Sequence, residues 1–235
     1  MATTYLFDYG GTLDTAATHW FYVFQTAYQS LSLNVEETLL RQAYVTGERA
    51  LAKERIILPT DDFHSLLRKK ITIQVHHLEE SLNVLHFATS EQRQQTIESL
   101  ASYCNNFAHE HVKASAQVLQ QLHDSHKLVM VSNFYGNLHK VLEVYGILPY
   151  FDAIIESAVV GVRKPDPAIW QLGIDASGTI AKNCIAVGDS YGKDIVPAAS
   201  IGCKTIWFKG REWEDKSYDE TLPTRVITAL QQLLV

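Results

Sequence analysis

Short apolar runs recur along this chain of 235 residues and alternate, over its second half, with stretches of helical periodicity. The runs predict buried strands at Thr4–Phe7, Lys127–Val131, Ala153–Ile155, Cys184–Val187 and Lys204–Phe208. The predicted helices cover about residues 115–125, 137–145, 167–175, 194–200 and 223–234. Strands that alternate with helices are typical of a parallel sheet with helices on both faces. The pattern therefore predicts an α/β fold, a doubly wound parallel sheet of five strands with Thr4–Phe7 in the middle.

The segment from residue 15 to about residue 107 has a different pattern. Strand-like runs disappear, and Leu39–Ile56 and Glu91–His109 carry apolar residues at helical spacing. We therefore expect an all-helical domain at residues 15–107, inserted into a core formed by residues 1–14 and 108–235.

Composition narrows the classes of function. The formal net charge is −6 and no cluster of Lys and Arg stands out, so we expect no nucleic-acid partner. No apolar stretch approaches the roughly 20 residues that a membrane helix needs, and the chain enters its first strand with no room for a signal peptide. The three cysteines are far apart and odd in number, which is typical of reduced thiols. Together these features predict a cytoplasmic protein without a membrane partner.

Polar residues follow the predicted strands at the points where they end. Asp8 comes directly after the first strand, and two glycines then allow the backbone to turn sharply. In a parallel sheet the carboxyl ends of the strands gather at one edge, where ligands bind. The side chains expected at or near this edge are Asp8, Ser132, Asn133, Lys164, Asp189 and Asp194. Three carboxylates would repel one another without a cation among them, and ligation by oxygen alone suits Mg²⁺.

These residues resemble the four ordered motifs of the haloacid dehalogenase (HAD) superfamily, which consists mostly of phosphoryl-transfer enzymes. The motifs are Asp8 to Thr12, then Ser132, then Lys164, then Gly188-Asp189-Ser190 with Asp194. The resemblance implies a Rossmann-like core. It also implies that the helical insertion is a cap of the C1 type, which closes over the active site and selects the substrate.

The resemblance further implies the roles of the residues that handle the metal. Asp8 would be the nucleophile and form an aspartyl-phosphate. Mg²⁺ would be held by the Asp8 side chain, the backbone carbonyl of Gly10 and Asp189. Asp194 would support Lys164 or a metal-bound water.

The remaining motif residues are implied to bind the phosphoryl group of a small phosphorylated metabolite. Ser132 and Asn133 would form hydrogen bonds with a phosphoryl oxygen. Lys164 would offset its charge. The expected activity is that of a Mg²⁺-dependent phosphatase, and the sequence predicts neither the substrate nor the oligomeric state.

Gly10 departs from the pattern of the superfamily. Its phosphatases usually carry Asp at this position, two residues after the nucleophile, and that Asp protonates the leaving oxygen. Three substitutes are open: Asp14 acts as acid/base, a cap residue supplies the proton, or the substrate has a good leaving group, as in an acyl phosphate, a pyrophosphate or an anomeric phosphate. Superfamily members with Gly here look like sugar-1-phosphatases, which favours the third. A fourth hypothesis is a regulatory protein that binds phosphate without turnover.

Two other branches of the superfamily also lack this Asp. The 2-haloacid dehalogenases carry Tyr and use a cap arginine, for which Arg41 is a candidate, but they do not need Mg²⁺ or the Gly-Asp-Ser pattern retained here. The phosphonoacetaldehyde hydrolases carry Ala and use a cap lysine as a Schiff base. Lys53 lies in a comparable region, although an exposed helix lysine is favoured because a reactive lysine needs an apolar or cationic setting. Arg49 and Lys53 are the candidate substrate contacts from the cap.

Overall fold

The computed structural model describes residues 3–234, so residues 1, 2 and 235 of the predicted core lie outside the described part of the chain. Its centre is a six-stranded sheet in the order β3-β2-β1-β4-β5-β6, with every neighbouring pair parallel. The strands are β1 Thr4–Phe7, β2 Lys127–Ser132, β3 Ala153–Glu156, β4 Cys184–Gly188, β5 Lys204–Phe208 and β6 Arg225–Ile227. The α/β fold and the central position of the first strand are confirmed.

Strand register brings the predicted site residues to one edge of the sheet. Phe7 pairs with Met130 on one side and with Val187 on the other. The backbone N–H of Asp8 continues the ladder by donating to the Val187 carbonyl at 2.9 Å. Three neighbouring strands therefore end level with one another, just before Asp8, near Ser132 and just before the segment that begins with Asp189.

Helices cover both faces of the sheet. Helix α7 (Ala168–Ser177) packs on one face against β1, β2 and β3. Its close approach needs glycine at position 173, where an added Cβ would lie 2.7 Å from a methyl group of Val131. The second half of α4 and the 3-10 helix Leu230–Leu234 cover the other face. The remaining helical segments of the core are α5 Leu138–Val144, Leu148–Tyr150, α6 Ser157–Val160, Ala181–Asn183, the π-helical turn Tyr191–Ile195 and α8 Val196–Ser200.

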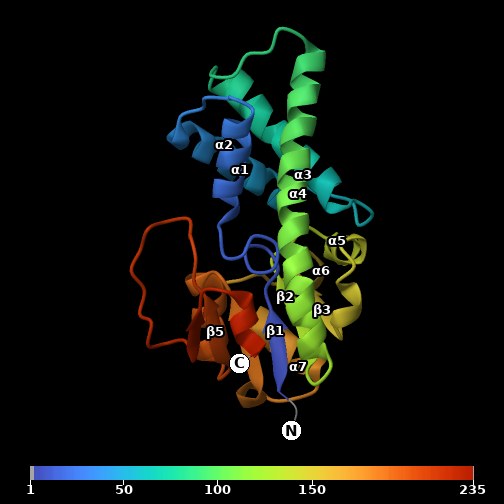
Figure 1. Cartoon of the computed structure of the whole chain (residues 1–235), viewed down its shortest axis with the longest axis vertical. Helices are drawn as coiled ribbons and strands as arrows, with labels where there is room; N and C mark the ends of the chain where they lie inside the picture. Colours follow the sequence, from blue (N-terminus) through green and yellow to red (C-terminus); the bar gives the residue numbers. More distant parts are fainter. Residues whose placement is uncertain (1–2, 235) are drawn as a thin grey trace.

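The cap lies above the carboxyl edge of the sheet in Figure 1. It consists of α1 Trp20–Ser30, α2 Glu37–Lys53, α3 Phe63–His76, the π-helical turn His77–Ser81 and the first half of α4 Ser90–His123. Helix α4 is 34 residues long and runs from the cap down to β2. The predicted boundary between residues 107 and 108 falls inside this helix. The helix predicted at residues 115–125 is its last part.

The prediction of a helix over residues 223–234 is wrong for its first part, and only Leu230–Leu234 are helical, as a 3-10 helix. Residues Arg225–Ile227 form β6, which pairs with the free edge of β5 and places Ile227 beside Phe208. Val226 and Ile227 are β-branched, which suits a strand, and pairing with β5 outweighs the helical spacing of this short segment. The sheet thus gains a sixth strand.

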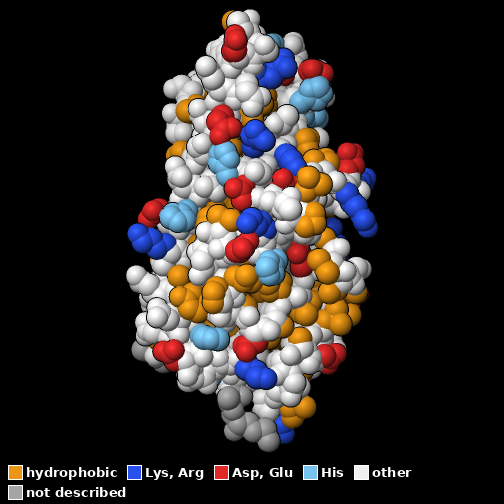
Figure 2. Space-filling view, turned by 90° about the vertical axis from the view of Figure 1, so that its right-hand side faces the viewer, with side chains coloured by type: hydrophobic (Ala, Val, Ile, Leu, Met, Phe, Trp, Pro, Cys, Tyr) orange, Lys and Arg blue, Asp and Glu red, His pale blue; other side chains and the backbone are white. Residues whose placement is uncertain are grey.

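The surface carries charges of both signs. On the face shown in Figure 2, acidic and basic side chains are interspersed, and apolar side chains gather over the core half of the molecule. Among residues 3–234, the helices include none with the length and apolar character needed to cross a bilayer.

Candidate active site

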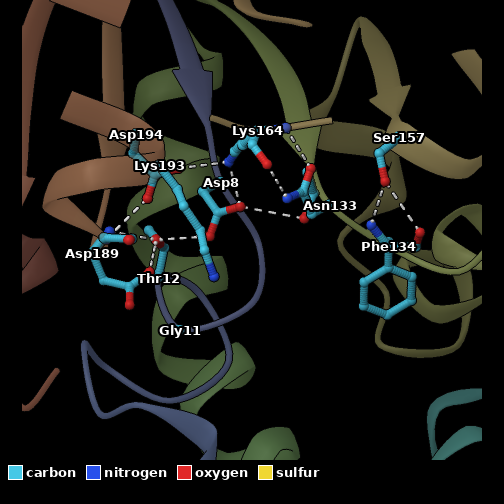
Figure 3. A network of polar contacts seen from close by, with 12 residues as sticks. Asp8, Gly11, Thr12, Asn133, Phe134, Ser157, Lys164, Asp189, Lys193 and Asp194 are labelled. Carbon is cyan, nitrogen blue, oxygen red and sulfur yellow. Dashed lines mark hydrogen bonds and ion pairs between the residues drawn. The ribbon is translucent and has the colours of Figure 1, made fainter. Parts of the chain in front are cut away.

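Asp8 is at the centre of a polar network at the carboxyl edge of the sheet (Figure 3). One of its oxygens, Oδ1, accepts hydrogen bonds from Lys164 Nζ at 2.6 Å and from the Ser132 hydroxyl at 3.3 Å. The other, Oδ2, lies 3.2 Å from the hydroxyl of Thr12. Three residues that are far apart in the sequence, Asp8, Ser132 and Lys164, are thus brought together.

Lys164 connects Asp8 to Asp194. Its Nζ donates to Asp194 Oδ1 at 2.7 Å, and the second oxygen of Asp194 accepts the Ser190 N–H at 2.9 Å. Burial alone would lower the pKa of Lys164, but the carboxylates of Asp194 and Asp8 raise it overall, so the amine stays charged. Burial raises the pKa of Asp194 to about 6, with Lys164 opposing this shift and Asp8 adding to it.

Asp189 approaches from β4. The Thr12 hydroxyl lies 3.0 Å from Asp189 Oδ1 and accepts the Asp189 N–H at 3.0 Å, so Thr12 bridges the two acids. Gly11 is required beside it, because its φ is +100° and an added Cβ would lie 2.4 Å from the Asp189 carboxylate. Burial raises the pKa of Asp189 well above its usual value, and Asp8 and Asp194 raise it further.

Oxygens of Asp8, Asp189 and Asp194 lie within 4.8 Å of one another. Lys164 is bonded to two of these carboxylates, Asp8 and Asp194, and balances one charge, so the fully ionised cluster carries two surplus negative charges in a buried site. Carboxylate oxygens are the donors that hard divalent cations prefer. The residues therefore fit a divalent cation, which Asp8 and Asp189 would hold.

A family model agrees with this geometry. The model of the haloacid dehalogenase-like hydrolases matches residues 2–202. The chain belongs to this family. Its membership confirms the superfamily predicted from the four motifs.

Curated relatives match the HAD chain over shorter stretches. The haloacid dehalogenase-like hydrolase domain-containing protein 3 of Danio rerio is 32% identical over 104 residues, which cover 44% of this chain and 43% of the relative. The glyceraldehyde 3-phosphate phosphatase of Pyrococcus furiosus is 39% identical over 87 residues, or 36% of each chain. The matches thus span less than half the length of these relatives. Magnesium-bound YfnB of Bacillus subtilis, a HAD hydrolase, shares the fold with a TM-score of 0.60 at 18% identity, over 99% of this chain and 96% of that one.

Gly10 leaves open space where the HAD phosphatases usually carry a carboxylate. It is exposed, and a Cβ added there would meet no atom of the described residues within 4 Å. The proposed role of its carbonyl as a metal ligand stays a prediction.

Asp14, the proposed substitute acid/base, is fully buried and already bound. Its Oδ1 accepts the Gly11 N–H at 2.7 Å, and its Oδ2 accepts the indole N–H of Trp20 at 3.0 Å. Burial raises the pKa of Asp14 to about 7. It therefore titrates near neutral pH, but reaching a substrate would require breaking both hydrogen bonds.

Asn133 faces the loop of Lys164. Its Nδ2 donates to the Lys164 carbonyl at 3.0 Å, and its Oδ1 accepts the Lys164 N–H at 2.8 Å. The side chain of Asn133 thus holds the backbone of Lys164 in place. The predicted contact between Asn133 and a phosphoryl oxygen stays a prediction.

The cap candidates from the sequence lie apart from this network. Arg49 and Lys53 are exposed on α2. The guanidinium of Arg41 packs between the rings of Phe21 and Trp213, 4.2 and 4.4 Å from their centroids. Arg41 is therefore occupied in the contact between the cap and the loop after β5.

A buried cap lysine, Lys70, was missed by the sequence analysis. Its Nζ donates to Glu48 at 2.7 Å and to the hydroxyl of Tyr135 at 3.0 Å, three residues beyond Ser132. Lys70 follows Leu66 by four residues on the apolar stripe of α3, and this position was the signal for its burial.

Proposed function

We propose that the chain is a Mg²⁺-dependent phosphatase that hydrolyses a small phosphorylated metabolite through an aspartyl-phosphate at Asp8. The observation that carries the proposal is that the two oxygens of Asp8 have different contacts. Oδ1 is held by Lys164 and Ser132, whereas Oδ2 faces the hydroxyl of Thr12, which also contacts Asp189. A carboxylate fixed in this way is oriented for attack.

The chain's own residues account for most of the mechanism. A carboxylate oxygen of Asp8 attacks phosphorus, and the electron pair of the P–O bond moves to the leaving oxygen. Ser132 and Lys164 are placed to contact oxygens of the transferred group, so they orient it and offset its charge. Water then hydrolyses the aspartyl-phosphate. Bound Mg²⁺ would supply electrostatic stabilisation of the phosphoryl oxygens and neutralise the surplus carboxylates.

Gly10 restricts the substrates of this phosphatase. A positioned acid contributes about 10²–10⁴-fold when the leaving oxygen is basic. Because position 10 carries no acid and Asp14 is held by two hydrogen bonds, the favoured substrates have good leaving groups. The relative named glyceraldehyde 3-phosphate phosphatase supports a phosphorylated small molecule as the substrate class.

A second candidate is a regulatory protein that binds phosphate without turnover, and the same features at Gly10 and Asp14 favour it. Covalent trapping separates the two. With Mg²⁺ and beryllofluoride, a phosphatase should form an adduct on Asp8, and Asp8→Asn should abolish both the adduct and turnover because an amide is a poor nucleophile. Thermal stabilisation by Mg²⁺ and phosphate without an adduct, and without turnover on a metabolite panel, would favour the binding protein.

A further inference from the structure

Lys193 belongs to the same turn as Asp194, but its side chain is exposed, whereas that of Asp194 is buried against Lys164. It lies in the π-helical turn Tyr191–Ile195, and the Trp170 indole donates to its carbonyl at 3.3 Å. In the view of Figure 3 its side chain runs from the turn across Asp8, and its amine ends on the opposite side of Asp8 from the amine of Lys164. The side chain is exposed, and among residues 3–234 the amine has no hydrogen-bond or ion-pair partner.

The charge of Lys193 acts on the cap side of the site. His19, the residue that precedes the first cap helix, has its pKa lowered to about 4, first by burial and then by Lys193. The Lys193 ammonium is therefore near enough to the start of the cap to act on His19. His19 is neutral at neutral pH, so it supplies no cation there.

Room for a leaving group exists at position 10, two residues after Asp8. Gly10 is exposed, and the space that a side chain would take at position 10 is open. Lys164 already donates to Asp8 and Asp194, and its third hydrogen bond is assigned to the transferred phosphoryl group, so it is not available to the leaving group. Lys193 is thus a cation next to Asp194 in the turn that borders the site, with its hydrogen bonds unused.

The charge of the loaded site calls for such a cation. Lys164 and one divalent cation together balance the three carboxylates Asp8, Asp189 and Asp194. A phosphoryl dianion then adds negative charge that these groups leave uncompensated. An ammonium preorganised near the leaving oxygen stabilises the charge that develops there in the transition state.

We propose that Lys193 is a catalytic residue that stabilises the leaving group as an anion, so that the substrates are phosphates of acidic hydroxyls, acyl phosphates in particular. The inference rests on the proposed phosphatase function. Asp8 forms a bond to phosphorus while the P–O bond to the leaving group breaks, and its electron pair stays on the leaving oxygen. The leaving group departs as a carboxylate or phenolate paired with the Lys193 ammonium, and the step requires no proton from position 10.

A series of leaving groups tests the role of Lys193. Acetyl phosphate and substituted phenyl phosphates of rising leaving-group pKa are compared on the full chain with Mg²⁺. Lys193→Met should lower kcat/KM by about 10–100-fold, as loss of one charge-stabilising group does. The loss should grow as the leaving oxygen becomes more basic, and Lys193→Arg should restore most of the activity. Lys182→Met, an exposed lysine just before β4 at the other end of the strand from Asp189, is the matched control.

Different results would overturn the role of Lys193 and the proposed phosphatase function. Activity of Lys193→Met within twofold of the unmodified chain would overturn the assignment. So would an equal loss for every leaving group, which indicates a structural role. Thermal melts of the variants identify any loss of folding, and Lys193→Arg then decides. If the unmodified chain turned over no member of the series and formed no beryllofluoride adduct, the proposed phosphatase function would fail instead.

Discussion

Lys164 in the core and Lys70 in the cap are both buried lysines, yet they sit among different numbers of carboxylates. Lys70 meets one carboxylate, Glu48, and the hydroxyl of Tyr135. Lys164 meets two carboxylates, Asp8 and Asp194. The cap cluster is balanced by its own members, whereas the core cluster, with Asp189 added, has surplus negative charge.

The pKa shifts of the carboxylates follow this difference. Burial alone would raise the pKa of Glu48, but Lys70 and the hydrogen bonds around it lower the pKa overall. The pKa of Asp189 is raised by burial and by its acidic neighbours. A buried carboxylate with a lowered pKa belongs to a complete structural contact. A buried carboxylate with a raised pKa is typical of a site that binds a cation.

The largest effect of a substitution is expected at Asp189. Asp189→Asn should weaken Mg²⁺ binding and phosphatase activity together, by at least about 10–100-fold, because even residues that only orient a metal ligand cost that much. In the metal-free protein it should increase the free energy of unfolding, since one repelling carboxylate is removed. Calorimetric titration with Mg²⁺ and denaturant unfolding check both signs. Asp175→Asn, an exposed site on α7, is the control. Unchanged metal binding and activity would remove Asp189 from the site.

The cap cluster should respond in the opposite way. Lys70→Met leaves Glu48 without its cation, and breaking a buried pair costs about 3–5 kcal/mol. Because the Glu48 side chain is 31% exposed, we expect a smaller loss, about 2–3 kcal/mol, in the free energy of unfolding. Mg²⁺ affinity should stay the same. Lys140→Met, which removes an exposed pair with Glu143, should cost less. A stabilised Lys70→Met protein would contradict the structural role of the cluster.

The raised pKa values of the buried carboxylates in the core should make the free energy of unfolding depend on pH. Unfolded Asp has a pKa of about 3.9, whereas in the folded chain burial raises the pKa of Asp194 to about 6 and that of Asp14 to about 7. Between these values the folded state holds more protons on Asp194 and Asp14, so these two groups should lower the free energy of unfolding of the metal-free protein as pH rises from about 4 to about 7. His19, whose folded pKa is lowered to about 4, should act in the opposite direction over the same range.

Mg²⁺ separates the two contributions to this slope. Saturating Mg²⁺ should flatten the part due to Asp194 and Asp189, because it favours their ionised forms. The part due to Asp14 should remain, since Asp14 is held by Gly11 and Trp20, and Asp14→Asn should remove it. Denaturant unfolding across this pH range, with Mg²⁺ and with EDTA, measures both. A pH dependence in EDTA that Asp14→Asn leaves unchanged would contradict the raised pKa of Asp14.

The features predicted correctly from the sequence are those with strong local signals in the chain. β1 and β5 have the predicted bounds, because each is an apolar run flanked by polar residues or glycine. The motif residues converge because parallel strands in register end at one edge. Lys70 was missed because a lysine is by default an exposed residue, and its partner Tyr135 becomes a neighbour only when the cap packs on the core. β6 was missed for the same reason, since its pairing partner lies outside its own segment.

The smallest expected effect concerns the open space at Gly10. Gly10→Asp should raise hydrolysis of alkyl phosphates several-fold more than that of acyl or aryl phosphates, because protonation matters most for a basic leaving oxygen. The new carboxylate meets no steric barrier, since a Cβ at this position is free of contacts within 4 Å. It also adds negative charge near Asp8, so Mg²⁺ affinity must be measured alongside, and Gly10→Asn provides a matched neutral control. If Gly10→Asp changed alkyl and acyl phosphates equally, the absent acid would not be what limits the choice of leaving group. If Gly10→Asn gave the same selective gain, the effect would come from shape rather than from proton transfer.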